Sequence, residues 1–84
     1  MNREVAIVVF NIVKRKFSVD LEIPLNITAN ELVVALNSAY ELGIDTTNIK
    51  NCYLKAENPI ALLKGNKTLR EFGVRNGSTI IYSE

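Results

Sequence analysis

A strict alternation of apolar and polar side chains between Phe17 and Ile23 is the feature that most constrains the fold of this chain. Every second residue is apolar and the residues between are polar or acidic: Phe17, Val19, Leu21 and Ile23 against Ser18, Asp20 and Glu22. This spacing places the apolar groups on one face of a β-strand and the polar groups on the other. Pro24 has no N–H for a sheet ladder, so it predicts the end of the strand.

A second strand is predicted just before it, because the run from Val5 to Val13 is apolar and rich in β-branched residues. The segment Lys14-Arg15-Lys16 separates the two runs and is a poor tight turn. We therefore expect a hairpin with a loop longer than two residues.

The orientation of this first strand is ambiguous, because both of its alternating sets are apolar. A sheet that packs a helix on one face needs only one such set. We expect Val5, Ile7 and Val9 to face the core, which leaves Val8 and Phe10 on the outer face of the sheet.

A helix over 29–42 is predicted after the hairpin. Thr28 and Glu31 have the spacing of a capping box, in which each side chain bonds a backbone N–H at the helix start. Gly43 favours the left-handed conformation that ends helices, and Ile44 can pack back onto the last turn. The expected apolar stripe consists of Leu32, Ala35, Leu36 and Ala39.

The remaining chain predicts three more strands. Cys52, Leu54 and Ala56 alternate with Tyr53, Lys55 and Glu57 in the third, and Asn58-Pro59 turns the chain. A short fourth strand is expected over 60–64 and a fifth over 78–82. This order is that of an α+β, β-grasp fold, with a mixed sheet of four to five strands packed on one helix. The first and last strands should lie side by side, and 1–84 should form one domain.

The closing segment carries a family resemblance. Thr68-Leu69, Phe72, Val74 and Ser78-Thr79-Ile80 occupy steps matching those of ubiquitin, and the run from Val19 through Pro24 to Thr28 resembles it too. The size of the chain and the closure "EFGVRNGSTI" resemble the YukD/EsaB family, small ubiquitin-like proteins of Gram-positive type VII (ESX-like) secretion systems. The resemblance implies a cytosolic accessory or regulatory component. Its partners would be cytoplasmic domains of membrane-embedded secretion subunits, or another copy of the chain.

Conjugation to other proteins is not expected. Ubiquitin-like modifiers and sulfur carriers end in a flexible Gly-Gly tail, whereas this sequence reads Tyr82-Ser83-Glu84 after the predicted last strand.

Composition argues against an enzyme. The chain has no histidine, which is the commonest general base and metal ligand, and no cofactor or metal motif is evident. Cys52 is the only cysteine, so no internal disulfide forms, and we expect it to be a small buried side chain. The apolar run from Val5 to Val13 is shorter than the roughly 20 residues of a membrane span. These features predict a soluble cytoplasmic protein without membrane insertion.

A docking surface is the remaining candidate site. The predicted partner-binding residues on the outer sheet face are Val8, Phe10, Tyr53, Lys55 and Ile81, rimmed by Lys14 and Lys16.

Two alternatives stay open from the sequence. One is a β-grasp adaptor of another signalling or toxin–immunity system. The other is nucleic-acid binding through the basic segment from Lys50 to Arg75 with Tyr53 and Phe72, which a net charge of +1 disfavours. No nucleic-acid partner is therefore expected.

Overall fold

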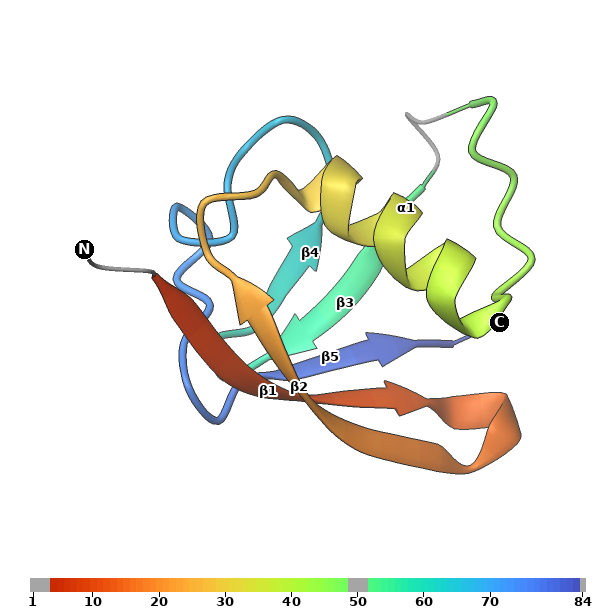
Figure 1. The fold of residues 1–84 in the computed structure, drawn as a ribbon, viewed down its shortest axis with the longest axis horizontal. Coiled ribbons are helices and arrows are strands. Elements are labelled where there is room, and N and C mark those ends of the chain that lie inside the picture. The colour runs from red at the N-terminus through yellow and green to blue at the C-terminus, as the bar shows by residue number, and fades with distance from the viewer. Residues whose placement is uncertain (1–3, 49–51, 84) are drawn as a thin grey trace.

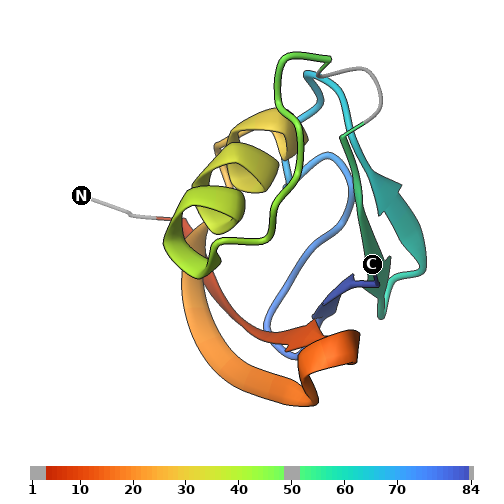
Figure 2. The ribbon, with the colours of Figure 1, turned by 90° about the vertical axis from the view of Figure 1, so that its right-hand side faces the viewer.

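A five-stranded mixed sheet covered on one face by helix α1 forms the described part of the chain (Figure 1, Figure 2). The computed structural model describes residues 4–48 and 52–83. The elements are β1 (Val5–Ile12), the short 3-10 helix η1 (Val13–Arg15), β2 (Phe17–Pro24), α1 (Ala29–Tyr40), β3 (Leu54–Glu57), β4 (Ala61–Leu63) and β5 (Thr79–Tyr82). The strands lie in the order β2-β1-β5-β3-β4, with β1 and β5 parallel at the centre. The predicted β-grasp architecture is confirmed.

The orientation of β1 is the opposite of the predicted one. Val8 and Phe10 are 1% and 0% exposed and lie in the core with Ala6 and Ile12. The prediction that Val8 and Phe10 face outward is therefore wrong. The odd-numbered residues occupy the outer face, where Ile7 is 47% exposed.

The register of the hairpin explains this reversal. Antiparallel pairing sets Phe10 opposite Val19 and Val8 opposite Leu21. Residues directly opposite each other share a face of the sheet, so the apolar set of β2 determines which set of β1 faces the helix. The connection 13–16 fixes this pairing, and the composition of β1 alone does not reveal it.

Arg15 in this connection attaches the hairpin to the end of the helix. Its Nη1 and Nη2 donate to the carbonyl oxygens of Tyr40 and Glu41, each at 2.6 Å. The last carbonyls of a helix have no partner within the helix, and a cation there also opposes the negative end of the helix dipole. The basic segment that made a poor tight turn thus serves as a helix cap.

Helix α1 begins as predicted and ends earlier. The Glu31 N–H donates to Thr28 Oγ1 at 3.1 Å, and the Thr28 N–H donates to Glu31 Oε1 at 2.9 Å, so the capping box is confirmed. The helix ends at Tyr40 because Glu41 adopts a left-handed conformation with φ 52°, ahead of Gly43.

The buried stripe of α1 overlaps the predicted one only in part. Leu32 and Leu36 are buried, whereas Ala35 and Ala39 are exposed. The other buried positions are Ala29 and Val33. The larger side chains Leu32, Val33 and Leu36 therefore pack into the core, and Ala35 and Ala39 do not.

The third and fifth strands follow the predicted alternation. Cys52, Leu54 and Ala56 are buried, and the Cys52 Sγ lies 3.2 Å from the carbonyl oxygen of Asp45. Ile80 is buried, which places Ile81 on the opposite face. The expectation that Cys52 is a small core side chain is confirmed.

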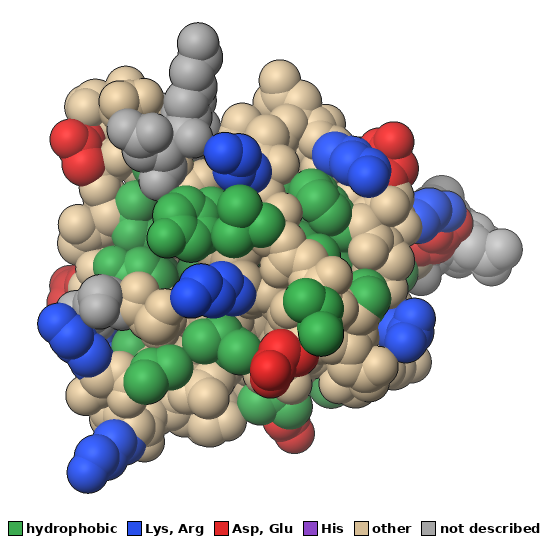
Figure 3. Space-filling view, turned by 180° about the vertical axis from the view of Figure 1, so that it is seen from behind, with side chains coloured by type: hydrophobic (Ala, Val, Ile, Leu, Met, Phe, Trp, Pro, Cys, Tyr) green, Lys and Arg blue, Asp and Glu red, His purple; other side chains and the backbone are tan. Residues whose placement is uncertain are grey.

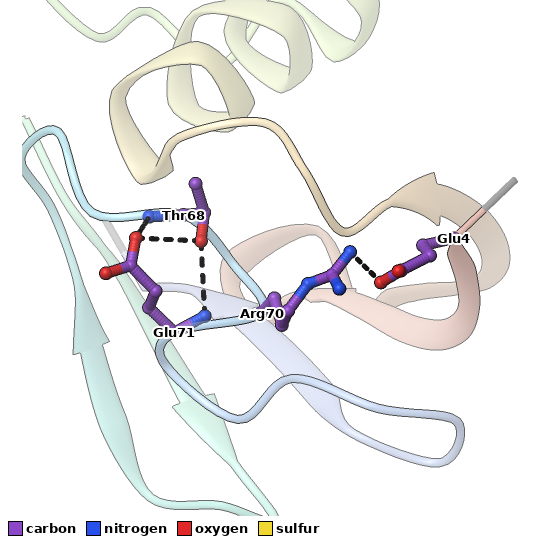
Figure 4. A network of polar contacts seen from close by, with 4 residues as sticks. All are labelled: Glu4, Thr68, Arg70 and Glu71. Carbon is purple, nitrogen blue, oxygen red and sulfur yellow. Dashed lines mark hydrogen bonds and ion pairs between the residues drawn. The ribbon is translucent and has the colours of Figure 1, made fainter.

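A compact turn at Thr68–Glu71 lies between β4 and β5 (Figure 4), and its backbone is hydrogen-bonded to the segment between β2 and α1. The Thr68 N–H donates to Glu71 Oε1 at 3.0 Å and the Glu71 N–H donates to Thr68 Oγ1 at 3.2 Å, while Arg70 forms an ion pair with Glu4. The Leu69 N–H donates to the Ile27 carbonyl at 2.9 Å. Hydrogen bonds from the backbone and side chain of Thr68 lower the pKa of Glu71.

The orientation of β1 predicts unequal effects of two substitutions. Phe10→Ala should lower the free energy of unfolding by about 3–5 kcal/mol, because it empties a fully buried aromatic site. Ile7→Ala, on the same strand but half-exposed, should cost less than about 1 kcal/mol. Urea unfolding of both variants measures the difference, and equal losses would contradict the orientation.

The turn at Glu71 predicts a pH-dependent stability. A carboxylate whose pKa is lowered by folding stabilises the protein above its unfolded-state pKa, and this contribution is lost as pH falls through the folded-state value. The difference in unfolding free energy between wild type and Glu71→Gln should therefore be present at neutral pH and shrink below the ordinary value of 4.5. Glu57→Gln, which removes an exposed strand carboxylate, is the control. A Glu71→Gln difference that does not vary with pH would refute the assignment.

Candidate partner-binding surface

The face of the sheet opposite α1 contains a row of side chains from the central and outer strands. Lys55 in β3 lies between Ile81 of β5 and Leu62 of β4, with which it is in register. Asn11 of β1 continues the row on the other side of Ile81. Tyr53, two residues before Lys55, has the same orientation by alternation. We call Tyr53, Lys55, Leu62 and Ile81 the outer-face patch.

The apolar members of the outer-face patch are accessible. Tyr53 and Leu62 are exposed, and Ile81 is half-buried. Ile60, in the turn before β4, is almost fully exposed. Figure 3 shows apolar groups on this side of the molecule with lysine or arginine side chains between them. The face thus combines apolar contact area with positive charge.

The structure brings together three of the five residues predicted from the sequence. Tyr53, Lys55 and Ile81 share the outer face, whereas Val8 and Phe10 lie beneath the sheet in the core. Leu62 was missed as a site residue. Alternation shows that every second residue of β4 shares the face of Lys55, but only the pairing of Leu62 with Lys55 shows which ones.

Charge is unevenly distributed on this face. In residues 4–48 and 52–83 no acidic group forms an ion pair with Lys55. Lys14 and Lys16 are exposed at the hairpin end. Asp20 and Glu22 belong to β2 at the edge of the sheet, opposite Val9 and Ile7. The centre of the face combines apolar groups with Lys55 and, two residues further along β3, with Glu57, whereas its β2 edge is acidic.

The aromatic residues considered for base stacking differ in accessibility. Tyr53 is exposed, whereas Phe72 is half-buried against the core with the Lys67 ammonium 5.0 Å from its ring centroid. Lys50, the first residue of the basic segment, lies outside the described residues.

Two further features concern metal ions and membranes. Among the residues that the structure describes, no group of three or more histidine, cysteine, aspartate or glutamate side chains could hold a metal ion. Over the same residues, no helix has the length and apolarity needed to cross a bilayer.

Comparison with known proteins identifies the family. Residues 5–81 match the family described as "WXG100 protein secretion system (Wss), protein YukD". The chain belongs to the YukD family. The resemblance seen in the closing segment is thereby confirmed, and the protein is a ubiquitin-like member of a secretion-associated family. The comparison with curated proteins gave no match.

Solved structures share the fold of this YukD family member. A ubiquitin-like domain from tubulin-binding cofactor B is similar with a TM-score of 0.76 and 19% identity, over 99% of this chain and 92% of that one. The C-terminal ubiquitin-like domain of mouse tubulin-specific chaperone e gives 0.72 and 10%, over 99% and 89%. The ubiquitin-like domain of yeast Ddi1 gives 0.66 and 12%, over 96% and 90%. At these identities the likeness establishes the fold alone.

Proposed function

We propose that this protein is a non-enzymatic interaction module of the WXG100 secretion system, which acts in the cytoplasm by reversible docking through the outer-face patch. The observation that carries the proposal is the exposed apolar surface around Lys55, on the sheet face that α1 leaves uncovered. Membership of the YukD family, whose description names the WXG100 protein secretion system, supports the assignment to that system. Docking changes the assembly or activity of the machine, and no covalent bond is made or broken.

The composition of the outer-face patch suits protein recognition. Apolar area ringed by polar and charged groups is typical of interaction sites, and tyrosine is enriched among residues that dominate binding energy. Burying about 100 Å² of apolar surface contributes on the order of 2.5 kcal/mol before the costs of association. Tyr53 and Leu62 together can therefore anchor a partner.

The partner that fits this patch is a cytoplasmic domain of a membrane-embedded subunit of the secretion machine. Lys55 at the centre of the patch favours a surface on which a carboxylate lies among apolar side chains. Its ammonium would gain a charged partner that the described residues do not provide.

Substitution of Leu62 tests the proposal. Leu62→Asp should weaken binding to the cytoplasmic domains of the secretion subunits by roughly tenfold or more, because it places a charge in the apolar contact. Val34→Asp is the matched control, since Val34 is 46% exposed on α1 and Leu62 is 47% exposed on β4. Titration of purified domains by calorimetry, with circular dichroism to verify folding, measures both. Equal affinities for wild type and Leu62→Asp, or a loss only in Val34→Asp, would refute docking through this face.

A further inference from the structure

The outer edge of β2 offers hydrogen-bonding groups that no described residue occupies. β2 is the first strand in the order β2-β1-β5-β3-β4, so only β1 pairs with it. An unpaired strand edge is a template for the addition of another strand. At eight residues β2 is long for an edge strand, whereas β4 at the other edge has three residues.

The hydrogen bonds of β1 identify which groups of β2 are free. The Val9 N–H donates to the Ser78 carbonyl at 2.9 Å and the Gly77 N–H donates to the Ile7 carbonyl at 3.0 Å. Odd-numbered residues of β1 thus point their backbone groups away from β2. The even-numbered residues point toward it, and their partners in β2 are odd-numbered.

The free backbone groups of β2 therefore belong to its even-numbered residues. The N–H and C=O of Ser18, Asp20 and Glu22 point away from β1. The bond at 2.9 Å from the Leu25 N–H to the Glu4 carbonyl continues the same alternation. Pro24 has no N–H at one end, and Lys16 leaves the strand conformation with φ 51° at the other. These limits define a docking edge of three residues, Ser18, Asp20 and Glu22.

We propose that this docking edge binds an extended segment of another protein as an added antiparallel strand, in which basic residues alternate with apolar ones. The inference is independent of docking through the outer-face patch.

The acidic side chains of β2 determine which positions of the added strand are basic. Asp20 and Glu22 point to the outer face, as their partners Val9 and Ile7 do. Residues of an added strand that lie directly opposite them would have side chains on the same face. Lysine or arginine at these positions forms cross-strand ion pairs, whereas acidic residues repel.

The apolar side chains of β2 determine which positions of the added strand are apolar. On the inner side of β2, Phe17 is 39% exposed, and Val19 and Leu21 are half-buried. Alternate residues of an added strand would lie beside these side chains. Apolar groups there would remove the remaining surface of Val19 and Leu21 from water.

The same geometry disfavours a second copy of β2 as the added strand. The free backbone groups of two β2 strands can pair only when even-numbered residues of one copy lie opposite even-numbered residues of the other. Of such registers, the two with the fullest overlap place Asp20 opposite Asp20, or Asp20 opposite Glu22, of the other copy. Both oppose like charges directly, which destabilises the pair. The edge is therefore selective for a basic partner.

Two synthetic peptides of identical composition provide the decisive probe. Both alternate lysine and valine over the length of β2. In the first the valine nitrogens are methylated, which blocks self-association but leaves the lysine N–H groups that would bond Ser18, Asp20 and Glu22. In the second the lysine nitrogens are methylated instead. NMR of the labelled full chain should show that only the first peptide shifts the amides of Ser18, Asp20 and Glu22 and slows their hydrogen exchange.

A charge-reversed protein tests the selectivity. Asp20→Lys/Glu22→Lys should weaken binding of the first peptide roughly tenfold or more and favour a glutamate–valine version of it, because two attractive pairs become repulsive. Glu57→Lys, on β3, should leave the affinity unchanged. Equal binding of the two methylated peptides, shifts confined to the outer-face patch, or no binding would overturn the proposal. The peptide comparison uses wild-type protein, so it remains decisive if the charge-reversed variant does not fold.

Discussion

The pairing of β1 with β2 is the interaction on which the other features of this domain depend. It places Phe10 opposite Val19 and Val8 opposite Leu21, and so determines which residues of the central strand face α1. β1 also pairs with β5, so the orientation of β1 determines which residues of β5 face the core and which face outward. Arg15 then ties the hairpin to the carbonyl end of the helix. The pairing of β1 with β2 therefore affects the core, the attachment of the helix and the orientation of the closing strand.

The same alternation makes the two sides of the sheet different. Side chains on the inner face form the core, while Tyr53, Lys55, Leu62 and Ile81 remain available to a partner. Within β2 the apolar residues form the backbone hydrogen bonds with β1. The residues whose N–H and C=O groups point away from β1 include Asp20 and Glu22. A sheet with one covered face can therefore present an apolar surface around Lys55 and an acidic edge. We propose both the surface and the edge as separate docking sites for protein partners.

Local signals in the sequence were sufficient for much of the fold. The capping box at Thr28 and Glu31 and the alternation around Leu54 each depend on a few neighbouring residues, and both are confirmed. The orientation of β1 could not be read in this way, because both of its sets are apolar and the deciding contact is with β2. The helix end was also misplaced, since Glu41 rather than Gly43 adopts the first left-handed conformation. Leu62 was missed because its orientation depends on its pairing with Lys55.

Amide hydrogen exchange along β2 tests the register most directly. The register between β1 and β2 predicts slow exchange at Val19, Leu21 and Ile23, whose N–H groups bond β1. It predicts fast exchange at Ser18, Asp20 and Glu22, whose N–H groups face solvent. NMR of the isolated protein can resolve these amides individually. The opposite alternation, or equal protection of all six, would contradict the register from which the core, the outer-face patch and the docking edge are derived.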